Sequence, residues 1–407
     1  MTLTFSRPAR ALARVLALAA ATAAAACARA PRVATTTSTT TSAATTSAAT
    51  TPAPALRDVF RDAFLVGVAL NPDQFSERDA RAAALVKAQF NSASPENVLK
   101  WEIVQPRPGP NGYDFAAADR YVAFAERNGL FPIGHTLVWH NQTPRWVFED
   151  AAGRPASRDT VLARMREHIL AVVGRYRGRI KGWDVVNEAL AEDGSLRPSP
   201  WLRTVGEDYL VKAYEYAHEA DPGAELYYND FALENAPKRA GAVALIRRLQ
   251  AAGVPLKAIG TQEHNKLAWP TVAQVDSTIT AFAATGVRVN VTELDVDVLP
   301  PATRSVGAEV SMRAEARAAL DPYKGGLPDS VQQALARRYA ELFGVYLRHR
   351  DVIDRVTFWN VTDADSWLND WPVTGRTAYP LLFDRQARPK PAFAAVVRVA
   401  REGGAAR

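Results

Sequence analysis

The stretch GWDVVNEAL, residues 182–190, combines an apolar strand with a polar end. Its Trp and Val residues suit a strand that is covered on both faces, as in a parallel sheet. Asn187 and Glu188 then follow side by side at the carboxyl end. In parallel α/β folds this is the end of the strand that opens into a ligand site. The stretch therefore predicts a buried parallel strand that delivers a carboxylate to a site.

Seven further segments have the same short apolar character. The eight predicted strands are 64–70, 90–97, 134–140, 182–188, 225–230, 258–264, 287–296 and 355–361. Amphipathic segments with a helical period lie between several of them, at 119–129, 160–178, 240–253 and 331–350. Eight alternating strand and helix units predict an α/β fold, a single (β/α)₈ TIM barrel. A doubly wound sheet is the alternative, but GVALNPDQF after the first strand lacks its G-x-G-x-x-G loop.

The N-terminal 55 residues differ in composition from the rest. Three arginines precede an apolar run at 15–27 that is too short to anchor the chain across a bilayer, so residues 1–27 are predicted to be an export signal. Residues 28–55 are rich in Thr, Ser and Ala, a composition that predicts a flexible linker. The folded catalytic or binding domain is therefore predicted to span residues 56–407.

Cys27 is the only cysteine of the chain, which excludes a disulfide within it. Its place at the end of the apolar run resembles a bacterial lipoprotein signal, in which this cysteine is lipidated and becomes the new N-terminus. Ala24 stands where that signal usually has leucine. Ala28, which is not an aspartate, implies the outer membrane by the same resemblance. Ordinary cleavage and secretion is the alternative, and in either case we expect an exported protein.

The formal charge of +6 is concentrated in the N-terminal segment. Five of the 49 Lys and Arg residues precede Arg57, but none of the 43 acids does. The folded part is therefore nearly neutral. A neutral domain gives no support for nucleic-acid binding.

Polar and indole side chains gather at the carboxyl ends of the predicted strands. They are Glu96, Asn97, His135, His140, Asn187, Glu188, Gln262, His264, Glu293, Asp295 and Trp359. A single acid in such a place is often a helix cap or an ion-pair partner. Burying so many polar groups costs about 1 to 3 kcal/mol each unless they bind one another or a ligand. The set therefore predicts one site at this end of the barrel.

Two of these carboxylates, Glu188 and Glu293, come from the fourth and seventh predicted strands, which lie nearly opposite in a closed eight-stranded barrel. Paired carboxylates across a cleft are the groups that glycoside hydrolysis requires. A metal site is disfavoured because the six histidines include no H-E-x-x-H spacing and the lone cysteine lies in the export segment. No cofactor or metal is expected.

Tryptophans supply the planar surfaces that a sugar site needs. Five of them lie at or just beyond predicted strand ends: Trp139, Trp146, Trp359, Trp367 and Trp371. An indole in such a place can stack on the apolar face of a sugar ring. We expect Trp139, Trp359 and Trp367 to bind substrate, and Trp183 and Trp201 to lie in the core.

Taken together, these segments resemble glycoside hydrolase family 10, the endo-β-1,4-xylanases, from about residue 56 to residue 400. The motifs that carry the resemblance are SPENVLKW (94–101), GHTLVWHNQTPRW (134–146), WDVVNEAL (183–190), YYNDF (227–231), GTQEHN (260–265), VTELDV (291–296), FWNVTDADSWLND (358–370) and YPLLFDRQARPKPAF (379–393). The resemblance implies a (β/α)₈ barrel and a retaining endo-xylanase that acts on xylan and xylooligosaccharides, as a monomer, through a covalent glycosyl-enzyme. By the same resemblance Glu188 is the acid/base and Glu293 the nucleophile.

The resemblance also implies which residues contact the substrate or support the nucleophile. They are Glu96, Asn97, Lys100, His135, Trp139, Gln142, Asn187, Gln262, His264, Trp359 and Trp367. We expect Asn187 to bind the sugar 2-hydroxyl, and His264 with Asp295 to hold Glu293 ionised. Glu188 must begin protonated, so its pKa is expected to be raised by the neighbouring negative charge and by aromatic desolvation.

Two places depart from the family pattern. Phe231 and Ala232 stand where the family often has Tyr-Asn, and Asn360 stands where it often has glycine. The first change removes a phenol and an amide near the aglycone side, so we expect an altered leaving-group preference with the same bond cleaved. An inactive carbohydrate-binding protein and a tethered surface adhesin are the alternative functions. The former commonly lacks one of the two carboxylates, and both are present here.

Overall fold

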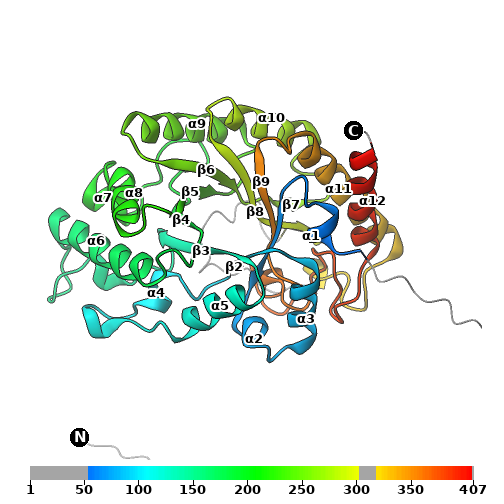
Figure 1. Cartoon of the computed structure of the whole chain (residues 1–407), viewed down its shortest axis with the longest axis horizontal. Helices are drawn as coiled ribbons and strands as arrows, with labels where there is room; N and C mark the ends of the chain where they lie inside the picture. The colour runs from blue at the N-terminus through cyan, green and yellow to red at the C-terminus, as the bar shows by residue number, and fades with distance from the viewer. Residues whose placement is uncertain (1–53, 302–317, 406–407) are drawn as a thin grey trace, which may run out of the picture. The chain divides into compact units, whose positions relative to one another are not determined.

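Eight parallel strands close into a barrel in the computed structural model, which describes residues 54–301 and 318–405 (Figure 1). The strands are β1 Leu65–Leu70, β2 Ser92–Pro95, β3 Phe131–Val138, β4 Gly182–Asn187, β5 Glu225–Asp230, β6 Leu256–Thr261, β8 Arg288–Asp297 and β9 Ile353–Phe358. Each strand pairs in parallel with the next in this order, and β9 pairs with β1 to close the barrel. A further strand, β7 His264–Lys266, pairs with β8 beyond the end of β6. The predicted (β/α)₈ barrel is confirmed.

Helices surround the strands (Figure 1). They are α1 Leu56–Val59, α2 Pro72–Phe75, α3 Ala80–Gln89, α4 Trp101–Val104, α5 Ala116–Arg127, α6 Arg158–Arg175, α7 Pro200–Val205, α8 Tyr209–Ala220, α9 Ala236–Ala251, α10 Val272–Ala283, α11 Asp329–Arg348 and α12 Pro391–Ala405. Short 3₁₀ turns lie at η1 Pro110–Gly112, η2 Arg145–Val147, η3 Ala318–Leu320 and η4 Trp367–Asn369. The four segments with a helical period correspond to α5, α6, α9 and α11. Within the described ranges, no helix is both long enough and apolar enough to cross a membrane.

The predicted export signal with Cys27, and the linker up to residue 53, lie outside the described residues. The same is true of residues 302–317, which connect β8 to η3. The predictions made for the export signal, the lipidated cysteine and the linker therefore stay predictions.

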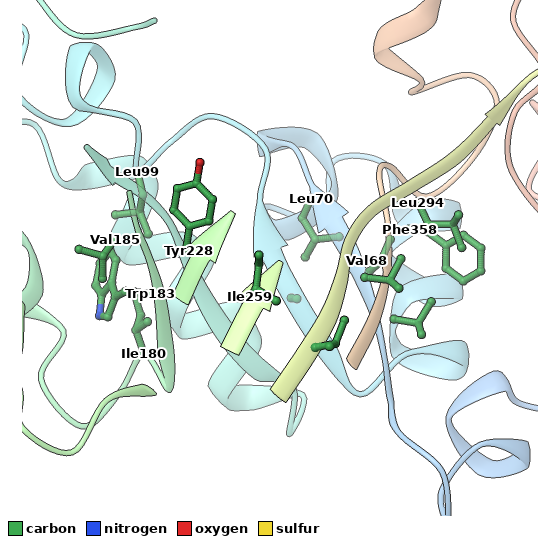
Figure 2. Packing of buried hydrophobic residues seen from close by; sticks show 14 of the residues in the cluster. Val68, Leu70, Leu99, Ile180, Trp183, Val185, Tyr228, Ile259, Leu294 and Phe358 are labelled. Atoms are coloured by element: carbon green, nitrogen blue, oxygen red, sulfur yellow. The ribbon is translucent and has the colours of Figure 1, made fainter. Parts of the chain in front are cut away.

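The strands are apolar because side chains cover both of their faces. Val68, Val185, Ile259 and Leu294 come from four different strands, and all are fully buried in one cluster (Figure 2). Trp183 and Trp201 are also buried, at 0% and 1% exposure, so their predicted place in the core is confirmed. This packing leaves the carboxyl ends of the strands as the place where polar side chains collect.

The observed strands differ from the predicted ones mainly at their ends. The third strand stops at Val138, so Trp139 and His140 belong to the loop that follows it. The sixth strand stops at Thr261, because Glu263 has a φ of +58°, which is incompatible with an extended strand. Both shifts move side chains that matter for the site.

Gly134 on β3 allows a close contact inside this core. A Cβ added there would lie 2.0 Å from the indole ring of Trp183, which is itself buried. We therefore expect Gly134→Ala to lower the free energy of unfolding by about 3 kcal/mol, through overpacking. Urea denaturation monitored by tryptophan fluorescence measures this loss.

Gly174→Ala in α6 is the matched control, because nothing lies within 4 Å of the added methyl group. This control is expected to leave stability unchanged or to raise it by about 0.5 kcal/mol, since alanine suits a helix better than glycine. Equal unfolding free energies for the two variants would show that Trp183 does not require a glycine at position 134.

Candidate active site

A cleft of about 820 Å³ opens at the carboxyl ends of the strands. Both predicted catalytic carboxylates line it, together with all the predicted substrate contacts: Glu96, Asn97, Lys100, His135, Trp139, Gln142, Asn187, Gln262, His264, Trp359 and Trp367. Asp295 does not line the cleft but lies behind His264. Residues from strand ends far apart in the sequence are thus brought to one site of a size that suits a small-molecule or oligosaccharide ligand.

Glu293 on β8 is held at both of its oxygens. The Asn229 amide donates to Oε1 at 2.8 Å, and His264 Nε2 lies 3.2 Å from Oε2. The other ring nitrogen of His264 lies 3.0 Å from Asp295 Oδ2. The carboxylate is therefore fixed by a chain of hydrogen bonds that runs from Asp295 through His264.

The charges along this chain favour an ionised Glu293. Burial alone raises the pKa of Glu293, but the hydrogen bond from His264 and nearby positive charges outweigh it and hold that pKa below its usual value. Burial lowers the pKa of His264, but the charge of Asp295 and the bonds to both carboxylates raise it to about 10. These shifts favour a protonated His264 beside an ionised Glu293.

Glu188, which directly follows β4, has the opposite electrostatic environment. Burial raises the pKa of Glu188, and the charge of Asp230 raises it further. Hydrogen bonds from Gln262 at 3.0 Å and from the Trp139 indole at 2.8 Å offset only part of this rise. The negative charge that was expected to raise the pKa of Glu188 therefore comes chiefly from Asp230, because Glu293 raises this pKa less. Two carboxyls in one cleft whose pKa values move apart can divide the roles of acid and nucleophile.

Two asparagines join the carboxyls. Asn187 and Asn229 are paired in register on β4 and β5, and the Asn229 amide donates to Asn187 Oδ1 at 3.0 Å as well as to Glu293. Thr292 donates to Asn229 Oδ1 at 2.6 Å, which orients the amide. With its oxygen occupied, Asn187 keeps its amino group for Glu188 Oε1, at 3.4 Å, and for a ligand.

Lys100 and three further polar residues, Asn97, Glu96 and His135, lie on the cleft wall beside β2 and β3. Lys100 Nζ donates to Asn97 Oδ1 at 3.0 Å and lies 4.9 Å from the centre of the Trp139 ring. Burial lowers the pKa of Lys100, against the raising effect of nearby carboxylates, and burial raises the pKa of Glu96. His135 is oriented by Asp184, whose carboxylate lies 2.9 Å from its Nδ1. These groups offer donors and acceptors for hydroxyls.

The loop after β9 carries the aromatic wall. The Trp367 indole donates to Asp295 at 2.8 Å and stacks on Trp371 with ring centres 4.7 Å apart. Asn360 has a φ of +93°, a glycine-like conformation, and its Oδ1 accepts from the Trp367 backbone at 3.1 Å. The asparagine that departs from the family pattern therefore keeps the backbone conformation of a glycine and also caps this loop.

Comparison with known proteins identifies the family. Residues 55–399 match the family model of glycosyl hydrolase family 10. The chain belongs to this family. It is 43% identical to endo-1,4-beta-xylanase A of Xylanibacter ruminicola, over 83% of this chain and 90% of the relative. It is 38% identical to an endo-1,4-beta-xylanase of Geobacillus stearothermophilus, over 83% of this chain and 96% of the relative.

Solved family 10 structures agree with the fold. A GH10 endoxylanase retrieved from a sugarcane soil metagenome superimposes with a TM-score of 0.81 at 43% identity, covering 84% of this chain and 99% of the other. Xylanase XynB from Paenibacillus barcinonensis, in complex with a conduramine derivative, gives 0.75 at 38% identity, covering 85% and 99%. The whole barrel is thus shared with these family 10 proteins.

Two residues that the sequence placed at or just beyond predicted strand ends lie outside the cleft. His140 is packed behind Trp139, and burial together with the charges of Arg197 and Lys238 lowers its pKa to about 3. Trp146 packs edge-on against Trp101, outside the cleft. For His140 the reason is the end of β3 at Val138, since Trp139 takes the cleft-facing position and the next residue turns away.

Other residues of the site were not singled out from the sequence. Asn229 and Asp230 end β5, and their motif YYNDF had the same apolar-to-polar signal as the other strands. Asp230 accepts from Tyr228 at 2.5 Å and from the Leu190 backbone at 3.3 Å, and forms a fully buried ion pair with Lys238 at 2.8 Å. Further cleft-lining residues of this kind are Glu102, Asn141, Glu234, Trp269, Ala364, Asp365, Ser366, Asn369 and Asp370. Phe231, Ala232 and Trp371, which the sequence did single out, line the cleft as well.

Proposed function

We propose that this family 10 enzyme is an endo-1,4-β-xylanase that cleaves internal bonds of xylan with retention of anomeric configuration. The observation that carries the proposal is the pair of carboxyls with opposite pKa shifts, Glu188 raised and Glu293 lowered, in one cleft. Glycoside hydrolysis needs one protonated and one ionised carboxyl at the scissile bond, and retention is proposed because double displacement is general to the family. The match over 83% of this chain to relatives named endo-1,4-beta-xylanases supports xylan as the substrate.

The first step forms a bond between a Glu293 oxygen and the anomeric carbon while the glycosidic bond breaks. Glu188 gives its proton to the departing oxygen, so the leaving sugar departs as a neutral alcohol. The negative charge of Glu293 is then consumed in the glycosyl ester, which removes one of the charges that raise the pKa of Glu188. Glu188 can now accept a proton from water, which attacks the anomeric carbon and releases Glu293 as a carboxylate.

The remaining cleft residues hold the sugars. Asn187 is proposed to bind the 2-hydroxyl of the reacting sugar, because its amino group is directed toward Glu188 while its oxygen is engaged. Glu96 and Lys100 are proposed to bind hydroxyls of the next sugar on the glycone side. Trp139, Trp359 and Trp367 supply the planar faces for stacking, and no cofactor takes part in this mechanism.

Turnover of xylan decides between this function and its two alternatives. The full chain should release reducing ends from beechwood or oat xylan, and viscosity should fall early, as internal cleavage requires. Tight xylan binding without release of reducing ends would favour an inactive binding protein. Neither binding nor turnover would favour an adhesin that uses the barrel as a platform.

The cellular location is a further proposal, which rests on the sequence alone. Cys27 is proposed to carry a lipid anchor in the outer membrane, with the 28–55 linker as a stalk whose r.m.s. span is about 30 Å for a flexible coil. Cys27→Ser is expected to leave the kcat on xylan unchanged, while the protein moves from the membrane fraction to the soluble fraction. Fractionation with mass spectrometry of the mature N-terminus measures this. A soluble wild-type protein without lipid would show that the enzyme is secreted by ordinary cleavage.

A further inference from the structure

Glu263 is a buried acid at the mouth of the barrel that the mechanism does not use. It lies between Gln262 and His264, is 2% exposed, and has a φ of +58°. This left-handed conformation is unfavourable for a residue with a side chain, so surrounding contacts must stabilise it. Gln262 and His264 line the cleft, whereas Glu263 does not. Its side chain therefore serves something other than direct contact with substrate.

The Glu263 carboxyl is anchored to an outer helix. Tyr346 on α11 donates its hydroxyl to Oε2 at 2.5 Å, and the Asn265 amide donates to the same oxygen at 3.1 Å. Tyr346 is fully buried, and Asn265 is 1% exposed. The turn between β6 and β7 is thus tied to α11 through the Glu263 side chain.

The backbone of this turn also sets the position of β8. The Glu293 N–H donates to the Gln262 carbonyl at 3.0 Å, and the Asp295 N–H donates to the Glu263 carbonyl at 3.4 Å. On the cleft side, Gln262 reaches Glu188 at 3.0 Å and His264 lies 3.2 Å from Glu293. A rotation of the peptide at Glu263 would therefore disturb both catalytic carboxyls at once.

We propose that Glu263 is a positioning residue for both catalytic carboxyls, acting through Gln262 on Glu188 and through His264 on Glu293. The proposal rests on the proposed function, since it assigns those two carboxyls their roles. Glu263 acts by holding the turn in its left-handed conformation and does not touch substrate. Displacing the turn by about 1 Å is enough to cost on the order of 100-fold in rate.

The groups that face Glu263 make its neutral form the stable one. Burial raises the pKa of Glu263 to about 8, and the charge of Glu234 from the loop after β5 adds to this. Tyr346, Asn265 and Arg338, the last also on α11, act in the opposite direction. A raised folded-state pKa means that the stabilising effect is complete below the ordinary pKa of glutamate and is lost as the pH rises through about 8. The wild-type fold should therefore lose stability in the alkaline range, where the buried carboxyl must ionise, and the fold with a glutamine in its place should not lose stability for this reason.

The experiment compares Glu263→Ala and Glu263→Gln with the wild-type full chain on an aryl β-xylobioside and on xylan. Glu263→Ala is expected to lower kcat by about 10- to 100-fold with KM changed less than about threefold, because positioning of catalytic groups is lost and substrate contacts are kept. Both limbs of the pH profile should move to higher pH, since Glu188 and Glu293 each lose a hydrogen bond that lowers their pKa. Glu263→Gln keeps an acceptor for Tyr346 and should restore kcat to within about threefold of wild type.

Asp221→Ala is the structural control. Asp221 is 4% exposed and accepts from the backbones of Gly178 at 2.8 Å and Gly223 at 3.0 Å, at the start of the connection to β5. It should lose stability without any change in kcat or in the pH profile. A folded Glu263→Ala with wild-type kcat and pH limbs would overturn the proposal, as would a Glu263→Gln that is as slow as the alanine variant.

Two further measurements keep the test decisive. If Glu263→Ala does not fold, Tyr346→Phe removes only the hydroxyl that holds the carboxyl, and a wild-type kcat and pH profile in that variant would overturn the proposal. If the wild-type chain hydrolyses neither substrate, the proposed function fails. Crystal structures of the wild type and of Glu263→Ala then test separately whether Glu263 positions the two carboxyls. Loss of the Gln262–Glu188 and His264–Glu293 contacts in a variant supports the positioning role, and their retention at 3.0 and 3.2 Å contradicts it.

Discussion

Glu293→Ala is expected to lower kcat on all β-xylosides by on the order of 10⁵-fold, because removal of a nucleophile abolishes the covalent route and leaves only binding and the acid. The loss should be similar for good and poor leaving groups, since the nucleophile is needed for both. Steady-state kinetics with an aryl xylobioside and with xylan measure it. Asn229 and His264 would be left without their carboxylate partner, so circular dichroism and the unfolding midpoint should be compared at the same time.

Glu293→Gln is the matched control for the loss of the side chain, because it keeps the shape and an oxygen for Asn229 but is not a nucleophile. It should be as slow as the alanine variant. Azide should rescue only the alanine variant, by entering the vacated space and producing an α-xylosyl azide. A Glu293→Gln enzyme with more than about one tenth of wild-type kcat would rule out Glu293 as the nucleophile.

Glu188→Ala should show the second-largest effect, and one that depends on the leaving group. General acid catalysis contributes about 10²- to 10⁴-fold, so xylan should lose activity in this range while an activated aryl xylobioside loses little in the first step. Hydrolysis of the glycosyl-enzyme also needs Glu188, as base, so the aryl substrate should give a burst of phenol followed by a slow phase. Stopped-flow absorbance resolves the two phases.

Azide separates the two carboxyls in a single assay. In Glu188→Ala it attacks the glycosyl-enzyme from the face that the acid/base occupied and should yield a β-xylosyl azide, the opposite anomer to that of Glu293→Ala. Glu188→Gln, which keeps the shape of the side chain and one of the two oxygens that accept from Trp139 and Gln262, controls for packing. Exchanged anomers would mean that the two roles are reversed, and full activity of Glu188→Ala on xylan would place the acid elsewhere.

The sequence was sufficient for the barrel because its eight apolar strands and intervening helices repeat one physical pattern. It was also sufficient to indicate Glu188 and Glu293, since each lies toward the carboxyl end of an apolar segment and several other predicted strands show the same polar ending. The structure places both in the cleft.

The contacts between strands could not be predicted in the same way. Asn229 reaches Glu293 because β5 pairs with β4 so that Asn187 and Asn229 are in register, and the sequence contains no direct measure of register. His140 shows the same limitation, because a shift of two residues in the end of β3 decides which side chain faces the cleft. The charge of Asp230 beside Glu188 likewise depends on how the loop after β4 folds back onto β5.

Stereochemistry is the most direct test of the central claim, that Glu188 and Glu293 act as acid/base and nucleophile in a double displacement. Their carboxyls should lie about 5 to 5.5 Å apart, the separation of retaining enzymes, because a wider gap would leave room for water to attack directly. Proton NMR of a fresh digest of a β-xylooligosaccharide follows the anomeric signals before mutarotation. The account predicts that the β-anomer appears first and the α-anomer only later, whereas initial formation of the α-anomer would contradict it.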